Sequence, residues 1–330
     1  MSKGLTNLGN TCYMNSALQC LLHLPELSYQ TLINDIQKKS LKNDYQLMDE
    51  FNKLYQKMWD EEGGGIINTK SFLIEFMKRC QKDNIYFESF LQNDAQEFIT
   101  ILIDLLNNSI KRSINVQITG TPKNEYDKIK LESIHSWKSF FKNNYSSLIP
   151  LFYTKNIAFT VCEECNYTTR NHEPMSNLTL TMDMEYETLY DCLNEYTKKT
   201  KLDSNNEWKC DKCEKYVLAC KKNIFFSLSP VLIISLKLFR NNKKINKYIH
   251  FPEILDMEDY VINIKNQTYQ YRLIGICVHT GTLHGGHYYS ICRNYKNDQW
   301  YIFNDTNVKT TTIEHVLNET PYCLFYEKIN

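Results

Sequence analysis

Cys12 stands where a short turn sequence leads into an apolar stretch, and a thiol at such a position could act as a nucleophile. The preceding Gly9 and Asn10 suit a turn, and Asn10 or Thr11 could cap the helix that follows. Cys12 would then lie in the first helical turn, where the dipole and unpaired N–H groups lower the pKa of a thiol. The same N–H groups can hold a developing oxyanion, and the amide of Asn7 could add a donor. A cysteine that merely begins a helix is the alternative.

Three histidines, His279, His284 and His287, lie in one stretch near the C-terminal end, where they could supply a base. His287 begins a predicted strand directly after Gly285 and Gly286, beside which a substrate backbone could pass closely. An imidazole there could take the proton of a cysteine thiol as a general base. We therefore expect His287 to be catalytic, and His279 and His284 to be structural or exposed.

A group that could orient the imidazole follows on the next predicted strand. If strands at 287–292 and 299–304 pair as a hairpin, position 304 returns beside His287. The side chain of Asn304 or of Asp305 could then accept a hydrogen bond from the ring. The order cysteine, histidine, asparagine along the chain is that of papain-like thiol hydrolases.

Four other cysteines form two CxxC pairs separated by 44 residues, a pattern typical of metal ligands. Each pair can supply two thiolates from one tight turn, and two such turns make the tetrahedral S₄ set of a structural zinc site. Nothing in the pattern indicates an open coordination position, so we expect one structural Zn²⁺ per chain and no catalytic metal. Reduced thiols without a metal are the alternative. The four residues are Cys162, Cys165, Cys210 and Cys213.

Asp94 and Glu97 stand at the start of the most clearly amphipathic segment, which predicts a helix over 93–107. Being three residues apart, they share a face away from the apolar stripe. A cationic, extended peptide could pair with both carboxylates there. An ordinary acidic first turn, stabilised by the helix dipole, is the alternative.

The composition limits the classes of protein to which this chain could belong. Its 330 residues carry 38 Lys and Arg against 38 Asp and Glu, so bulk positive charge does not attract nucleic acid. No stretch approaches 18 consecutive apolar residues, and the N-terminus has no apolar signal segment, so we expect no membrane span. The 12 cysteines are then reduced thiols, which predicts a cytoplasmic or nuclear location.

Helical periodicity dominates the first half of the sequence and strand periodicity the second. Apolar residues recur at helical spacing over 44–59 and 93–107, whereas from about residue 155 they alternate with polar residues. The three glycines at 63–65 are typical of a loop tip between helices. Helices followed by sheet indicate an α+β protein, whose chemistry should lie where the two parts meet.

Three blocks of the sequence resemble those of the ubiquitin-specific proteases. The block GLTNLGNTCYMNSALQCLL resembles their Cys box, and LQNDAQEFITILIDLL resembles their glutamine/aspartate box. YRLIGICVHTGTLHGGHYYSICRN, followed by QWYIFNDTNV, resembles their His box. Together with the CxxC pairs, these blocks run in the order of the family from residue 4 to about 327, which is nearly the whole chain.

The resemblance implies a role for each matching residue. Cys12 matches the nucleophile, His287 the general base and Asn304 the residue that orients the base. Asp305 matches a neighbouring acid that shares this work in some members, and Asn7 matches the amide of the oxyanion hole. The implied substrate-binding residues are the two acids that would meet the basic tail of ubiquitin, Asp94 and Glu97, together with Gln92, Gly285, Gly286 and Tyr288.

The resemblance also implies a papain-like fold and one catalytic domain. It would have a helical thumb over 1–150, zinc-binding fingers over 151–235 and a β-sheet palm over 236–330. The implied enzyme is a monomer that acts on ubiquitin and ubiquitinated proteins. It would hydrolyse the peptide or isopeptide bond after the C-terminal glycine of ubiquitin through a thioester.

Two positions depart from the pattern of the family. Asn93 stands where a second glutamine is frequent, and Asn304 is an amide where some members have an aspartate. Two alternatives to the implied activity are a protease for another ubiquitin-like modifier and a non-catalytic ubiquitin-binding scaffold. A zinc-ribbon nucleic-acid protein is disfavoured by the zero net charge and the acidic residues inside the CxxC pairs.

Overall fold

The structure, a computed structural model, describes most of the chain. The described residues are 2–28, 45–60, 65–88, 91–240, 243–262, 268–282 and 285–329. His284 and the first two glycines of the predicted loop, at 63 and 64, lie outside these ranges. Within the ranges, no helix has the length and apolar character needed to cross a membrane.

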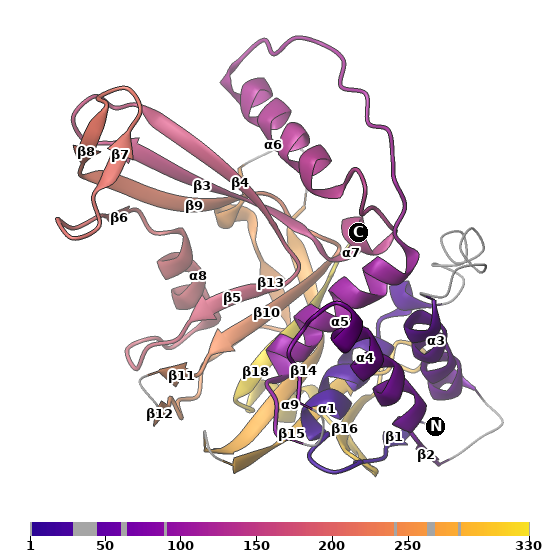
Figure 1. Cartoon of the computed structure of the whole chain (residues 1–330). Helices are drawn as coiled ribbons and strands as arrows, with labels where there is room; N and C mark the ends of the chain where they lie inside the picture. The colour runs from indigo at the N-terminus through magenta and orange to yellow at the C-terminus, as the bar shows by residue number, and fades with distance from the viewer. Residues whose placement is uncertain are drawn as a thin grey trace.

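The described residues up to 152 form a helical thumb (Figure 1). The predicted helices over 44–59 and 93–107 are confirmed as α3 and α5. All 11 residues of α1 are buried, because this helix runs between α5 and the large sheet. The elements are β1 (Gly4–Leu5), α1 (Cys12–Leu22), the 3₁₀ helix η1 (Pro25–Leu27), α3 (Gln46–Trp59), β2 (Ile66–Ile67), α4 (Lys70–Lys82), α5 (Ala95–Ile110), α6 (Glu125–Phe141) and α7 (Leu148–Phe152).

An eight-stranded sheet forms the palm, with the order β17-β16-β15-β14-β18-β10-β5 and with β13 paired to β14. Its centre is apolar on both faces, so β10 and β18 are buried over almost their whole length. The strands are β5 (Leu178–Thr181), β10 (Val231–Lys237), β13 (Ile254–Asp256), β14 (Gln270–Thr282), β15 (Gly285–Arg293), β16 (Trp300–Asn304), β17 (Asn307–Thr311) and β18 (Pro321–Lys328).

The expected boundary between fingers and palm, at 235/236, does not match the sheets. β5 and most of β10 come from the segment 151–235, yet both belong to the palm sheet. β10 pairs with β18 in antiparallel register and with β5 in parallel register, so the buried run 231–236 completes the palm core. The fingers are therefore built from two segments of the chain, one that precedes β5 and one that lies between β5 and β10.

The fingers carry long strands away from the rest of the molecule (Figure 1). Their sheet has the order β4-β3-β9-β6, and the hairpin β7–β8 lies at the far end. The elements are β3 (Thr154–Cys162), β4 (Thr168–Met175), α8 (Leu189–Thr197), β6 (Thr200–Lys201), β7 (Trp208–Cys210), β8 (Lys215–Val217) and β9 (Ala219–Ser227). The remaining elements are β11 (Phe239–Arg240), β12 (Lys243–Lys244), the 3₁₀ helix η2 (Glu258–Tyr260) and α9 (Ile313–Leu317).

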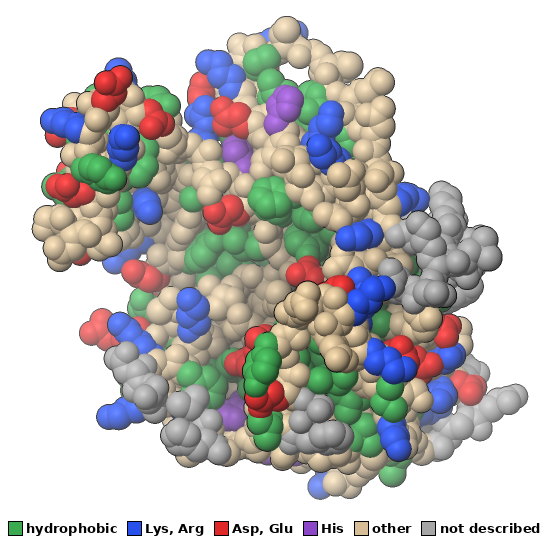
Figure 2. Space-filling view, viewed as in Figure 1, with side chains coloured by type: hydrophobic (Ala, Val, Ile, Leu, Met, Phe, Trp, Pro, Cys, Tyr) green, Lys and Arg blue, Asp and Glu red, His purple; other side chains and the backbone are tan. Residues whose placement is uncertain are grey.

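One large apolar core joins thumb and palm, and a small second core around Cys162, Cys210 and Val217 lies at the fingertips. Figure 2 shows the surface hollowed between the fingers at the upper left and the thumb and palm below. The α+β fold expected from the sequence is confirmed, and α1 lies at the junction of its helical and sheet parts.

Candidate active site and metal centre

A tight loop delivers the chain into α1. Gly9 and Asn10 both have positive φ, 102° and 55°, which explains the glycine and asparagine at these positions. Thr11 occupies the N-cap position but makes no side-chain cap. Its hydroxyl accepts from the backbone N–H of Leu8 at 2.9 Å and lies 3.3 Å from Asn7 Oδ1, so the expected side-chain cap at 11 is not formed. The threonine stabilises the loop instead.

Cys12 is the first residue of α1, as the sequence predicts, but its surroundings differ from the expected ones. The side chain is only 5% exposed, and this burial raises the pKa of the thiol above its ordinary value. The Asp305 carboxylate raises this pKa further, whereas hydrogen bonds from the backbone of Tyr288, Tyr13 and Cys12 itself lower it. The prediction of a lowered pKa for the Cys12 thiol is therefore wrong, because desolvation raises the pKa more than the N–H groups at the helix start lower it.

The predicted hairpin is confirmed, and it brings His287 to Asn304. β15 and β16 pair in antiparallel register with Ser290 opposite Phe303. The His287 Nε2 atom lies 2.7 Å from Asn304 Oδ1. Because a carbonyl oxygen only accepts, Nε2 carries the proton and Nδ1 keeps its lone pair. Asn304 therefore selects the tautomer in which Nδ1 can act as a base.

Asp305 turns away from this pair toward the loop before α1. Its Oδ2 accepts from Asn7 Nδ2 at 2.9 Å, and its Oδ1 accepts from Asn15 Nδ2 at 2.8 Å. Its backbone carbonyl also accepts from the N–H of Leu5 at 2.9 Å. Of the two candidates, the structure thus joins Asn304 to the imidazole and Asp305 to the amide of Asn7. Asn15 was not predicted, since only the tertiary fold brings it to position 305.

Gln92 forms a two-point contact with the backbone beside His287. Its Nε2 donates to the carbonyl of Gly286 at 3.1 Å, and its Oε1 accepts from the N–H of Gly286 at 3.2 Å. A Cβ at position 286 would lie 2.2 Å from Nε2 of His279, so only glycine fits there. His279 is buried, which lowers its pKa to about 4, and this confirms its expected structural position.

Asp94 is the N-cap of α5, and its carboxylate already has partners. Its Oδ1 accepts from the N–H groups of Gln96 at 2.7 Å and Glu97 at 3.2 Å, and Tyr322 donates to its other oxygen. The side chain of Glu97 is exposed, and it projects from the same first turn. The carboxylate of Asp94 thus stabilises the start of the helix, as the alternative of an ordinary acidic first turn predicts. The carboxylate of Glu97 faces solvent.

Two further predicted positions have local explanations. Tyr288 is 7% exposed and packs its ring 4.6 Å from that of His279, so its backbone rather than its side chain meets Cys12. Asn93 donates to the carbonyls of Glu88 at 2.8 Å and Leu91 at 3.1 Å. This departure from the pattern of the family thus stabilises the turn that precedes α5.

The four CxxC cysteines meet at the fingertips. Their sulfur atoms all lie within 4.8 Å of one another, so they could hold a metal ion. Each pair forms a knuckle in which the backbone N–H of the second cysteine approaches the sulfur of the first, at 3.5 and 3.4 Å. Asn166 and Glu214, which follow the knuckles, have φ of 56° and 57°, so both knuckles turn in the same way. The donors are Cys162, Cys165, Cys210 and Cys213.

Comparison with known proteins decides the family. A sequence model of the ubiquitin carboxyl-terminal hydrolases matches residues 3–326. The chain belongs to this family. Ubiquitin carboxyl-terminal hydrolase 2 of Bos taurus is 29% identical over 336 residues, covering 98% of this chain and 54% of the relative. Ubiquitin carboxyl-terminal hydrolase 4 of Saccharomyces cerevisiae is 27% identical over 363 residues, covering 99% and 39%. The chain thus spans about half, or less, of the length of these relatives.

Solved structures of SAGA DUB modules share the fold. The SAGA Ubp8/Sgf11/Sus1/Sgf73 DUB module bound to ubiquitin aldehyde matches with a TM-score of 0.69 at 25% identity, covering 99% of this chain and 70% of that chain. A SAGA DUB module bound to monoubiquitin matches with a TM-score of 0.74 at 24% identity, covering 99% and 70%. Fingers, palm and thumb are thus arranged here as in a deubiquitinase.

Proposed function

We propose that this member of the ubiquitin carboxyl-terminal hydrolase family is a thiol-dependent deubiquitinase. It would hydrolyse the peptide or isopeptide bond after the C-terminal glycine of ubiquitin. One observation carries the proposal: the thiol of Cys12 meets the backbone of Tyr288, the neighbour of a His287 ring that Asn304 holds in its basic tautomer. These two contacts support a site in which α1 supplies Cys12 as the thiol, β15 supplies His287 as the base and β16 supplies Asn304 as the orienting amide.

In the acylation step, the Nδ1 lone pair of His287 takes the proton of Cys12. The sulfur then forms a bond to the carbonyl carbon of the substrate, and the carbonyl electron pair moves to the oxygen. The Cys12 N–H and the second N–H of Asn7 Nδ2 would donate to this oxyanion. The other N–H of this side-chain amide donates to the carboxylate of Asp305, which fixes the orientation of the amide.

The tetrahedral adduct collapses as the C–N bond breaks. Nδ1 of His287 gives its proton to the leaving amine, and a thioester to Cys12 remains. Water then gives a proton to the same nitrogen as its oxygen forms a bond to the thioester carbonyl carbon. The C–S bond breaks, the Cys12 sulfur takes the proton back from His287, and the acid product is released as a carboxylate. Because burial raises the pKa of Cys12, we infer that the thiol is neutral at rest and is ionised by His287 only during the attack.

The substrate would enter as an extended tail between the start of α5 and β15. Glu97 faces solvent there and can pair directly with a basic residue of the tail. The carboxylate of Asp94 is already bonded to the N-terminus of α5, so it would attract the tail by its charge without direct pairing. Gln92 bridges to the backbone of Gly286 across this passage, so we infer that a tail replaces this contact as it binds. The globular body of ubiquitin would then occupy the hollow seen in Figure 2.

We further propose that the four-cysteine cluster holds one structural Zn²⁺. Four sulfur donors in two knuckles match the tetrahedral, closed preference of zinc. The bound ion would join β3 to the hairpin β7–β8 at the fingertips, far from α1 (Figure 1). The second small core around Cys162 and Cys210 is consistent with this role in holding the tip together.

Release of a fluorophore from the C-terminus of ubiquitin tests the function. We expect the wild-type chain to turn over this substrate and Cys12→Ala to be inactive. The same assay with a second ubiquitin-like modifier tests the alternative protease. Absence of turnover by folded wild-type protein on every modifier, combined with ubiquitin binding, would instead support the non-catalytic scaffold.

A further inference from the structure

Helix α6 is attached to the rest of the molecule by little apolar surface. Only Ser133 and Phe141 of its 17 residues are buried. It lies beside β4, the edge strand of the fingers sheet, at the upper side of the hollow (Figures 1 and 2). Along the chain, α6 stands between α5 of the thumb and β3 of the fingers. The contacts of α6 with β4 are therefore one of the restraints on the orientation of the fingers relative to the thumb, beside the connections through α7 and the palm.

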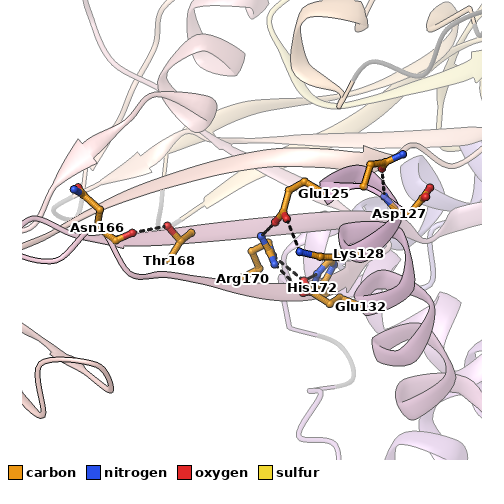
Figure 3. Close-up of polar contacts among 9 residues, drawn as sticks. Glu125, Asp127, Lys128, Glu132, Asn166, Thr168, Arg170 and His172 are labelled. Atoms are coloured by element: carbon orange, nitrogen blue, oxygen red, sulfur yellow. Dashed lines mark hydrogen bonds and ion pairs between the residues drawn. The ribbon is translucent and has the colours of Figure 1, made fainter. Parts of the chain in front are cut away.

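Polar contacts of Arg170 hold the N-terminal half of α6 to β4 (Figure 3). Nε of Arg170 lies 2.8 Å from Oε2 of Glu132, and Nη2 lies 2.8 Å from Oε1 of the same residue. The remaining nitrogen, Nη1, lies 2.7 Å from Oε1 of Glu125. One guanidinium thus joins two turns of α6 to a single position of β4. The planar fork makes this contact directional, which an ammonium cannot reproduce.

Neighbouring contacts repeat the same connection. Nε2 of His172 lies 3.4 Å from Oε2 of Glu132, and the hydroxyl of Ser136 donates to the backbone carbonyl of His172 at 3.0 Å. Farther along the helix, Nζ of Lys155 on β3 lies 4.5 Å from the centre of the Trp137 ring. A ring contact adds to these ties, since Tyr126 of α6 stacks on Phe226 of β9 with ring centres 6.1 Å apart. Among the polar ties between α6 and β4, Arg170 makes the most hydrogen bonds.

The contacts of Arg170 differ from an ordinary surface ion pair because they are several and join two elements, although the side chains of Glu125 and Glu132 are 61% and 41% exposed. The side chain of Arg170 is 19% exposed, and its hydrogen bonds lower the pKa of Glu132 and of Glu125 below their ordinary values. Lys128 also reaches Glu125, at 3.4 Å, but this pair is exposed and lies within α6 itself. Exposed pairs within one helix contribute little, whereas a multidentate contact between two elements constrains their relative position.

We propose that Arg170 is a positioning residue that sets the width of the hollow in which the globular body of ubiquitin binds. This inference rests on the proposed function. Loss of the guanidinium removes three contacts between the N-terminal half of α6 and β4, so the separation of the fingers and the thumb is less tightly fixed. Binding of the ubiquitin body weakens, while the tail passage and the Cys12 site are unchanged.

Two substrates separate this role from a general structural one. Arg170→Met keeps most of the aliphatic stem but removes all three nitrogen contacts, and Lys128→Met removes one positive charge from the same cluster without uncoupling two elements. With C-terminally labelled ubiquitin, we expect Arg170→Met to raise KM about fivefold at unchanged kcat, as for an interaction that contributes to binding alone. With a short peptide of the ubiquitin tail bearing the same fluorophore, we expect no change. Lys128→Met should behave as wild type with both, and Arg170→Lys should lie between wild type and Arg170→Met.

Equal losses with ubiquitin and the peptide would overturn the proposal, as would an unchanged KM for ubiquitin in Arg170→Met. Binding of unlabelled ubiquitin to a Cys12→Ala background, with and without Arg170→Met, measures the same effect as a fivefold change in Kd. This measurement tests the inference even if wild type proves inactive, an outcome that would reject only the proposed activity. Melting temperature and zinc content, which should match those of wild type, show that each variant is folded.

Discussion

Cys12 lies under the palm sheet at the start of a buried helix, whereas four other cysteines lie at the ends of two knuckles on the fingertips. The groups around Cys12 include the backbone of Tyr288, on the strand that carries His287, and the carboxylate of Asp305. Each fingertip sulfur has three other sulfurs within 4.8 Å. The same side chain thus has different neighbours in the two regions, and the proposed roles, nucleophile in one and metal ligand in the other, rest on this difference.

The difference shows that neighbours, not exposure alone, select the chemistry of a thiol. A single buried thiol is kept neutral by desolvation and needs a base to become reactive. A set of four sulfurs instead offers a metal its complete tetrahedral shell, and binding of the metal removes the protons. The predictions below test each side of this contrast, from the largest expected effect to the smallest.

Cys12→Ala should abolish turnover of labelled ubiquitin, a loss of about 10⁴-fold or more, since the nucleophile is removed. Cys20→Ala is the matched control, because Cys20 is also buried on α1 but lies 8 residues farther along the helix. Turnover by Cys20→Ala should remain, and both variants should keep about one zinc per chain. Activity of Cys12→Ala near the wild-type level would show that the thiol is not the nucleophile.

Asn304→Ala should lower kcat by about 10²-fold, since nothing then selects the tautomer of His287. Asn304→Asp should restore much of the rate, because a carboxylate oxygen also accepts from Nε2. The added negative charge stabilises the imidazolium, so the acidic limb of the pH–rate profile should move to higher pH. An Asn304→Ala variant with an unchanged kcat would remove Asn304 from the mechanism.

Cys210→Ser should lower the zinc content well below one per chain and reduce kcat/KM for ubiquitin by about tenfold, as the fingertip loses its cross-link. Turnover of a short tail peptide should be preserved, because the Cys12 site belongs to the other core. Metal analysis and the two substrates together make the test. Full zinc content in this variant would contradict the four-sulfur site.

Asp305→Asn should increase the reactivity of Cys12 toward iodoacetamide by a few fold at neutral pH. The Asp305 carboxylate raises the pKa of this thiol, so its removal lowers the pKa and increases the thiolate fraction at any pH below it. The midpoint of the alkylation rate against pH should therefore move to lower pH. An upward shift would show that the loss of the contact with Asn7 outweighs the removed charge.

Asp94→Asn separates helix capping from charge recognition. Asparagine caps as well as aspartate, so the melting temperature should change little, whereas Asp94→Ala should cost about 1 kcal/mol of stability. If the charge contributes to binding of the basic tail, Asp94→Asn should raise KM for ubiquitin about twofold. The same rise in KM is expected for Glu97→Gln, whose carboxylate is exposed. Unchanged KM values would leave the acidic turn with a structural role alone.

The order of the elements and most of the site residues could be predicted from local patterns. Apolar spacing located α5 and the hairpin β15–β16, and two knuckles located the sulfur cluster, because these features depend on residues close in sequence. The helix α4 and the contacts of Arg170 that join α6 to β4 were not predicted. Arg170 and Glu132 are 38 residues apart, and no short-range pattern relates them.

Sequence by itself determined which residue types were available: one cysteine at a helix start, one histidine at the start of a strand, an amide at the end of the next strand, and two CxxC pairs. Tertiary structure alone decided their states and their pairing. Burial in the folded chain raises the pKa of the Cys12 thiol, which the helix start was expected to lower. The fold also pairs the side chain of Asn304 with the imidazole of His287, and the carboxylate of Asp305 with the amide of Asn7. The physical reason is that desolvation and hydrogen-bond partners come from the palm, whose strands β15 and β16 pack on α1 although they are more than 250 residues away along the chain.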